Sequence, residues 1–201
     1  SVYEAELAKL FNNAWRYIQF SISNQFFMMS EKMGVNYYNV RKIMSEGYDR
    51  SKNIPKAGFV SGPCLLKDTM QLSAFFGGNF ILGNAAMNIN EGLPYFLVEK
   101  IKQKIKMKKN NVGILGMSFK ADIDDIRDSL SYKLGKILMF NGYNVFFSDE
   151  FVKDKTFITK EDLINKVELI IIAAPHKEYK KIKFPKSKKI VDIWSNSILN
   201  D

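Results

Sequence analysis

The sequence has one cysteine, Cys64, and one histidine, His176. A single cysteine excludes a disulfide within the chain, and together the two residues exclude a metal centre built from several thiolates or imidazoles. No uninterrupted apolar run approaches the roughly 20 residues of a membrane-spanning helix, and no basic stretch leads into an apolar one as in a signal peptide. We therefore expect a cytoplasmic protein with no membrane segment and no metal.

Acidic residues are outnumbered: the chain has 30 Lys and Arg against 21 Asp and Glu, a net charge of +9. The lysines are dispersed, and their densest run, residues 100–109, is typical of a solvated helix end. A nucleic-acid-binding protein would need a clustered cationic face, and no motif for one accompanies these lysines, so we expect no nucleic-acid partner. A cationic surface does favour a small anionic ligand such as a nucleotide diphosphate.

Residues 4–33 contain neither proline nor glycine, and their apolar residues recur at helical spacing. Ser1 and Glu4 have the spacing of a capping box, and Gly34 suits the left-handed position that ends a helix. The apolar residues occupy nearly all faces of this helix, so it must be covered on most of them. A second copy of the chain is the simplest partner that could cover these apolar faces. The pattern therefore predicts a homodimer formed through this helix.

The fold class changes at about residue 108. Before it, further helices are expected over residues 36–45, capped by Asn36, and over residues 66–76 and 80–107, with Pro94 kinking or dividing the last. After it, apolar strands alternate with helices, one of which is capped by Thr159. Strands are expected over residues 112–116, 143–147, 167–174 and 189–194. We predict an all-α dimerisation domain, residues 1–108, followed by a small α/β domain, residues 109–201, with a mainly parallel, Rossmann-like sheet.

The first of these strands ends in Gly113-Ile114-Leu115-Gly116, which resembles the start of a dinucleotide-binding turn. The third glycine of such a motif is missing, and no acidic residue except Asp149 ends the second strand cleanly, so the NAD signal is weak. A tight turn of this kind could still present its backbone N–H groups to a phosphate.

Cys64 follows a Gly-Pro pair and precedes the helix expected over residues 66–76. The helix N-terminus and the nearby ammonium of Lys67 both favour a thiolate, and Asp68 adds a carboxylate. A nucleophile, a cation and an acid/base group so close together are typical of covalent catalysis. The alternative is a buried structural cysteine, a common environment for a free thiol.

Lys9 and Asn13 are four residues apart and therefore share one face of the expected N-terminal helix. Such a pair is commonly part of a solvent-facing stripe. It gains a chemical role only if the cysteine lies opposite.

Four patterns, in this order and at these separations, resemble the NAD-dependent nucleotide-sugar 6-dehydrogenases of the UDP-glucose/GDP-mannose dehydrogenase family: residues 5–13, residues 62–69, residues 90–91, and residues 113–120 together with 124–129. In that family an NAD-binding domain precedes a central helical dimerisation domain and a C-terminal domain that binds the nucleotide of the sugar substrate. The chain resembles only the last two. The resemblance therefore implies part of an enzyme, inactive without an NAD-binding domain.

The resemblance also implies a reaction. The C6 alcohol of a UDP-sugar would be oxidised twice by NAD to the uronic acid, through a thiohemiacetal and a thioester on Cys64. Lys9 and Asn13 match residues that stabilise the oxyanion at C6, and Asp68 matches an acid/base or water-orienting group.

Further roles follow from the same resemblance. Residues matched to substrate binding are Phe119, Lys120 and Arg50, the last reaching a neighbouring subunit's substrate, and residues matched to the cofactor side are Lys67 and Arg127. Glycines of the family are replaced at Phe59 and Ser61, so the sugar stays open among glucose, N-acetylglucosamine, N-acetylmannosamine and others. His176 has no part in this scheme and is expected to be a loop histidine. The alternative from another functional class is a non-catalytic dimerisation and nucleotide-sugar-binding module.

Overall fold

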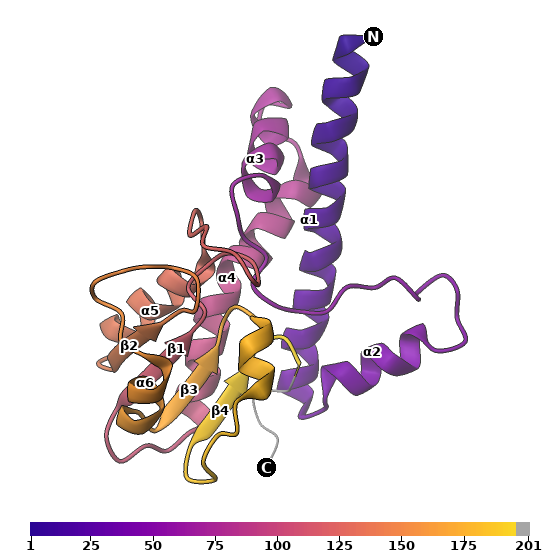
Figure 1. Ribbon diagram of the computed structural model, residues 1–201. Coiled ribbons are helices and arrows are strands. Elements are labelled where there is room, and N and C mark those ends of the chain that lie inside the picture. Colours follow the sequence, from indigo (N-terminus) through magenta and orange to yellow (C-terminus); the bar gives the residue numbers. More distant parts are fainter. Residues whose placement is uncertain (196–201) are drawn as a thin grey trace. The chain divides into compact units, whose positions relative to one another are not determined.

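The computed structural model describes residues 1–195, and the chain divides into two compact units, Ser1–Leu93 and a second that begins at Pro94 (Figure 1). The first is helical and the second is built on a sheet. Within the described range, none of the helices combines the length and apolar character needed to cross a membrane.

The first unit contains helices α1 (Val2–Met33), α2 (Tyr37–Ser45), α3 (Leu65–Phe75) and the beginning of α4 (Ile81–Lys104). The predicted caps of α1 are confirmed. The Ser1 hydroxyl accepts from the Glu4 backbone in a capping box, and Gly34 ends the helix at a φ of 71°. Asn36 caps α2, again as predicted, by accepting from the backbone N–H groups of Tyr38 and Asn39.

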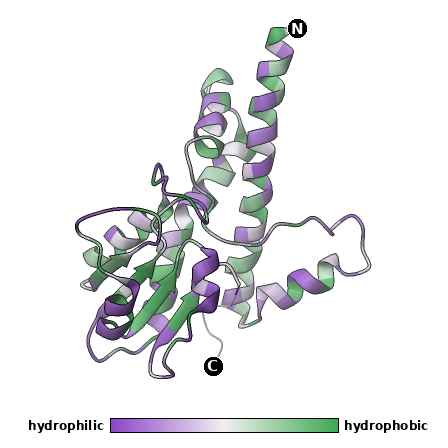
Figure 2. Cartoon of the chain, in the orientation of Figure 1, coloured by the Kyte–Doolittle hydropathy of each residue, from purple (hydrophilic) through white to green (hydrophobic). Residues whose placement is uncertain are grey.

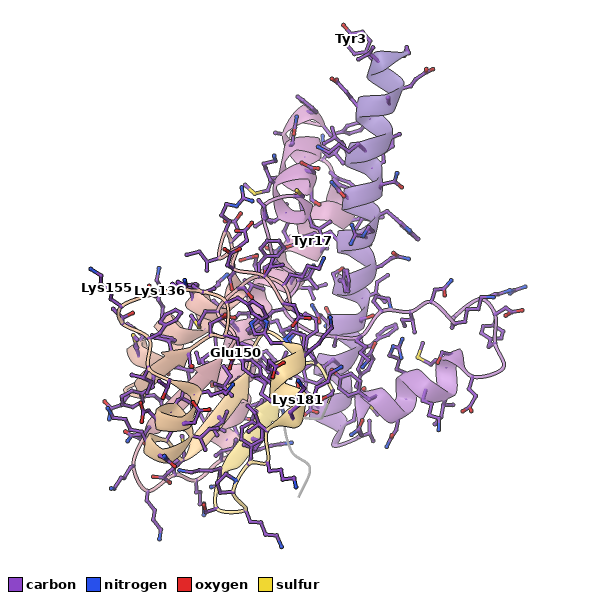
Figure 3. All side chains as sticks on the ribbon, viewed as in Figure 1. Tyr3, Tyr17, Lys136, Glu150, Lys155 and Lys181 are labelled. Atoms are coloured by element: carbon purple, nitrogen blue, oxygen red, sulfur yellow. The ribbon has the colours of Figure 1, made fainter. Side chains whose placement is uncertain are left out.

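The core of the first unit lies where α1, α4 and the segment before α3 meet. Tyr17, Val60 and Ala86 are buried together, and Leu65 and Leu66 pack against them. Figure 3 shows Tyr17 on the side of α1 toward this core, whereas Tyr3 projects from the N-terminal end of the helix. A second apolar row on α1 is exposed. Figure 2 shows that hydrophobic segments recur along the helix. The members of the exposed row are Tyr3, Leu7, Phe11, Trp15, Ile22, Phe26, Met29 and Met33.

Residues 46–64, between α2 and α3, form neither helix nor strand, yet their backbone is fixed by buried amides. Asn24 exchanges two hydrogen bonds with Gly58: its Nδ2 donates to the carbonyl oxygen at 3.1 Å, and the Gly58 N–H donates to its Oδ1 at 2.9 Å. Asn24 Nδ2 also donates to Asn90 Oδ1 at 2.9 Å. Both asparagines are fully buried. The segment that leads to Cys64 is therefore tied to α1 and α4.

The second unit is a four-stranded, all-parallel sheet in the order β2-β1-β3-β4, as the fold class predicted. The strands are β1 (Asn111–Leu115), β2 (Asn144–Ser148), β3 (Leu169–Ile172) and β4 (Lys189–Asp192). They are joined by α5 (Leu130–Phe140), α6 (Lys160–Lys166) and a short 3-10 helix, η1 (Lys177–Lys181), which the sequence pattern did not predict. The strands carry mostly hydrophobic residues (Figure 2), because the sheet is covered on both faces.

The position of the boundary between the units differs from the one expected. The hydrophobic pattern changes from helical to strand-like near residue 108, but the compact units divide between Leu93 and Pro94. The difference arises because α4 continues through Pro94 as one helix and its second half belongs to the sheet-containing unit. The predicted functional division at residue 108 stays a prediction.

Gly116 allows the end of β1 to approach the end of β3. Its φ is +91°, and a Cβ there would lie 2.6 Å from both the Cβ and the backbone nitrogen of Ala174. We predict that Gly116→Ala lowers the free energy of unfolding by about 2–5 kcal/mol, through overpacking and left-handed strain together.

The matched control is Gly142→Ala, because Gly142 has a φ of +82° with nothing within 4 Å of the added Cβ. This substitution adds only the left-handed backbone strain and should lower the free energy of unfolding by only about 1–2 kcal/mol. Urea unfolding followed by circular dichroism measures both variants. Equal losses would show that close approach to Ala174 contributes nothing.

Candidate active site

A buried carboxylate joins α1 to α3 in the first unit. Asp68 is 1% exposed. Asn13 Nδ2 donates to its Oδ2 at 2.6 Å, Lys9 Nζ lies 3.9 Å from the same oxygen, and Lys67 Nζ lies 4.0 Å from Oδ1. A carboxylate withdrawn from water requires such donors and cations. The structure thus brings together Lys9, Asn13, Lys67 and Asp68, which the sequence analysis had singled out as site residues.

Cys64 begins the same helix. It is the N-cap residue of α3, its side chain makes no capping hydrogen bond, and it is exposed. Its carbonyl oxygen accepts from the Asp68 backbone N–H at 2.9 Å, so the two residues are one helical turn apart. The interpretation of Cys64 as a buried structural cysteine is therefore wrong. The thiol is accessible beside the first turn of a helix whose fourth residue is the buried carboxylate.

The Lys9–Asn13 pair differs from an ordinary solvent-facing stripe. Lys9 is exposed, but Asn13 is half-buried because its amide turns toward Asp68. The two residues therefore lie on the face of α1 that meets α3. Arg50 is exposed in the turn region after α2, and its role toward a neighbouring subunit stays a prediction.

The remaining predicted site residues lie in the second unit, on the loop between β1 and α5. Lys120 is exposed and Phe119 is half-buried. Arg127 is engaged with Asp125, since its Nε and Nη2 donate to the carboxylate at 3.0 and 2.6 Å. These bonds lower the pKa of Asp125. The structure holds Arg127 on the same loop as Phe119 and Lys120.

The turn after β1 does not present its N–H groups to a phosphate, and that expectation is wrong. Met117 N and Ser118 N donate to Asp149 Oδ2 at 2.5 and 3.1 Å. Burial alone would raise the pKa of Asp149, but bonds from His176 and from backbone N–H groups, including that of Met117, outweigh it and lower the pKa to about 2. In similar turns the backbone N–H groups bind the pyrophosphate of a dinucleotide. Here they bind the carboxylate of Asp149, so the turn does not fit NAD.

His176 lies in the loop between β3 and η1, as expected for a loop histidine, but it is fully buried, and its Nε2 lies 3.1 Å from Asp149 Oδ2. The sequence offered one signal: a lone histidine just after an apolar strand, at the carboxyl edge of a parallel sheet. Among residues 1–195, no cluster of three or more His, Cys, Asp or Glu could hold a metal ion.

Comparison with known proteins identifies the chain. A model of the central domain of the UDP-glucose/GDP-mannose dehydrogenase family matches residues 3–92, and a model of the UDP binding domain of the same family matches residues 113–201. The chain belongs to the UDP-glucose/GDP-mannose dehydrogenase family. The two matched regions follow one another as in the family, and together they leave only residues 93–112 between them.

Individual members of the UDP-glucose/GDP-mannose dehydrogenase family support this assignment. A UDP-N-acetyl-D-mannosamine dehydrogenase of Methanocaldococcus jannaschii is 28% identical over 98% of this chain and 46% of its own length. The solved UDP-D-ManNAc dehydrogenase of Pyrococcus horikoshii has a TM-score of 0.83 at 28% identity, covering 98% of this chain and 49% of that one. An NDP-N-acetyl-D-galactosaminuronic acid dehydrogenase of Methanosarcina mazei has a TM-score of 0.84 at 25% identity, covering 100% and 48%. The chain spans about half the length of these relatives.

The bond between Asn13 and Asp68 predicts a specific effect of charge. Asn13→Asp would place a second carboxylate against a buried one. We expect a loss of about 1–3 kcal/mol of unfolding free energy at pH 7, from like-charge repulsion and the lost amide donor. The loss should shrink as the pH falls and one carboxyl takes up a proton.

Asn12→Asp is the control, since Asn12 is the exposed neighbour on α1 and receives the same charge. Its effect should stay within about 0.5 kcal/mol. Thermal unfolding at pH 7 and pH 4 distinguishes the two variants. An Asn13→Asp protein as stable at pH 7 as Asn12→Asp would contradict the contact.

Proposed function

We propose that this chain is the substrate-binding and covalent-catalysis portion of a UDP-sugar 6-dehydrogenase, with Cys64 as nucleophile. One observation carries the proposal. The accessible thiol begins the helix on which buried Asp68 is held by Asn13, with the Lys9 ammonium beside it. A module that only binds its ligand has no need of a nucleophile next to an acid/base group and an oxyanion-stabilising pair.

In the first oxidation, the C6 alcohol becomes an aldehyde as it loses a hydride and a proton. Asp68 is the proposed proton acceptor. Lys9 and Asn13 stabilise the negative charge that develops on the C6 oxygen. An amide nitrogen has two hydrogens. Asn13 can therefore keep its bond to Asp68 with one hydrogen and direct the other at the substrate oxygen.

In the second oxidation, the Cys64 thiolate adds to the aldehyde carbon and forms a C–S bond. Loss of a second hydride from this thiohemiacetal gives a thioester. Water, oriented by Asp68, then attacks the carbonyl carbon, the C–S bond breaks, and the carboxylate product leaves the regenerated thiolate behind. NAD would supply the hydride acceptor for both oxidations, held mainly by an NAD-binding domain joined to this chain, with Lys67 and Arg127 on the cofactor side.

The substrate class follows from the second unit and the relatives. The matched family model is a UDP binding domain, and Phe119 and Lys120 are the proposed contacts to the nucleotide sugar there, with Arg50 reaching the substrate of a neighbouring subunit. Relatives named for UDP-N-acetyl-D-mannosamine make an N-acetylated sugar the first substrate to test. UDP-glucose is the reference substrate against which it should be compared.

We also propose a homodimer through α1. The exposed apolar row on this helix is long, and monomeric proteins rarely leave so large a patch in water. The row recurs mainly every three or four residues, so it forms one stripe that a second copy of the same helix could cover.

Cys64→Ala tests the chemistry. With the NAD-binding domain present, the variant should form no uronic acid and should produce no NADH from the UDP-sugar alcohol beyond the first oxidation. Product analysis with NADH absorbance measures both. UDP binding should be unchanged because the thiol lies in the other unit. Full acid formation by Cys64→Ala would refute the covalent mechanism, and UDP binding without any turnover by the wild type would favour a non-catalytic binding module.

Charged residues introduced into the exposed apolar row of α1 test the proposed dimer. Phe11→Glu with Trp15→Glu should convert a species of about twice 23.2 kDa into a monomer in sedimentation analysis. The control is Asn12→Glu with Arg16→Glu, which puts the same substitutions on exposed polar positions of the same helix. A wild-type monomer at micromolar concentration would overturn the proposal.

A further inference from the structure

His176 is a buried imidazole for which the reaction has no use. It follows β3 at the carboxyl edge of the sheet and is 0% exposed. Rings pack on two sides of it: Phe151 with a centroid distance of 4.9 Å and Tyr179 with one of 5.1 Å. A polar side chain buried among rings requires partners for both ring nitrogens.

The two nitrogens have different partners. The Asp122 backbone N–H donates to Nδ1 at 2.8 Å, so Nδ1 must be unprotonated and act as the acceptor. Nε2 then carries the ring hydrogen and donates to Asp149 Oδ2 at 3.1 Å. The bond to Asp149 involves the buried turn after β1. The bond to Asp122 connects His176 to the loop between β1 and α5.

Hydrogen bonds fix the conformation of that loop around Asp122. Asp122 has a φ of 60°, which is unusual for a residue with a side chain. His176 binds its N–H, and the Lys177 backbone N–H donates to its Oδ1 at 2.9 Å. Closer to β1, the Ser118 hydroxyl donates to the Lys120 carbonyl oxygen at 2.7 Å. The backbone on either side of Lys120 is therefore anchored, by Ser118 before it and by His176 after it.

We propose that His176 is a positioning residue for the nucleotide sugar: by accepting from Asp122, its Nδ1 fixes the loop that presents Phe119 and Lys120 to the substrate. The inference rests on the proposed function of these two residues. It differs from a purely structural role, in which the bond to Asp149 would matter and the bond to Asp122 would be incidental.

Two substitutions separate the two bonds. In His176→Asn, the amide oxygen occupies roughly the place of Nδ1 and can still accept from Asp122, while the donor to Asp149 is lost. In His176→Gln, the longer amide reaches the place of Nε2 and can still donate to Asp149, while the acceptor for the loop is lost. Both variants remove the ring, and their side chains differ from each other by one methylene group.

Titration calorimetry with UDP gives the first readout. We expect His176→Gln to weaken UDP binding about tenfold and His176→Asn to stay within about threefold of the wild type, since losing the loop's acceptor leaves a backbone donor unpaired. Equal weakening in both variants, or a larger loss in His176→Asn, would overturn the positioning role. A wild-type chain that does not bind UDP would refute the proposed function instead.

Amide hydrogen exchange of residues 119–128 gives a second readout that needs no ligand. The Asp122 amide should be protected in the wild type and in His176→Asn, and should exchange faster in His176→Gln. Equal protection in both variants would overturn the inference whether or not UDP binds.

If either histidine variant fails to fold, Asp122→Ala supplies the test. It leaves His176 and Asp149 intact but removes the carboxylate that accepts from Lys177, so the same loop loses its other anchor. UDP binding should weaken by about threefold or more. Unchanged affinity would show that the anchoring of this loop does not set the position of Phe119 and Lys120.

Discussion

A carboxylate withdrawn from water is the constraint on which the helical unit depends. Asp68 is almost fully buried, so the side chains that approach it have to be donors or cations, and α1 and α3 must meet where those side chains lie. Asn13 supplies the direct hydrogen bond, and Lys9 and Lys67 supply charge from the rim. The thiol of Cys64 is not needed for these contacts, yet Cys64 lies one turn from Asp68 on the same helix. The residues proposed for chemistry are thus placed by the same contact that joins the helices.

The buried network around Asn24 extends this arrangement to the segment before Cys64. That segment has no regular structure of its own, and its backbone groups would be unpaired if it were buried without partners. Asn24 of α1 provides such partners to both backbone groups of Gly58, and its amide also donates to Asn90 of α4. The segment before α3 is therefore fixed to α1 at Gly58. This fixation is required if a nucleophile is to meet its substrate at a set distance.

Much of this architecture is local, and local features were predictable. The capping residues Ser1, Asn36 and Thr159 act on backbone N–H groups two or three residues away, so their spacing in the sequence was sufficient. The parallel sheet followed from apolar strands alternating with helices. The cluster around Asp68 could be expected only through the family resemblance. Asn13 and Asp68 are 55 residues apart, and no local sequence pattern includes both residues.

The contacts that were missed are those in which a polar group satisfies a distant partner. Asp149 and His176 are 27 residues apart, and Asp122 and His176 are 54 apart. A single sequence reveals neither pairing. The same limit explains the turn after β1: its glycines predicted free N–H groups, and only the fold showed that a carboxylate from the end of β2 occupies them. The compact units divide inside α4 rather than near residue 108 for another reason, because hydrophobic periodicity identifies a helix but not the core to which each half of it belongs.

The occupied turn has a consequence for how this sheet would bind a nucleotide. In open parallel sheets, ligands bind at the carboxyl edge where the strand order reverses, and here that point lies between β1 and β3. Asp149 and His176 fill it with side chains that are 0% exposed. A phosphate brought there would meet a buried carboxylate rather than backbone donors, and repulsion would oppose binding. We propose that recognition of an anionic nucleotide falls instead to residues outside this buried pair. The β1–α5 loop, which is bonded to His176 and carries Lys120, provides the cation closest in sequence to the closed turn.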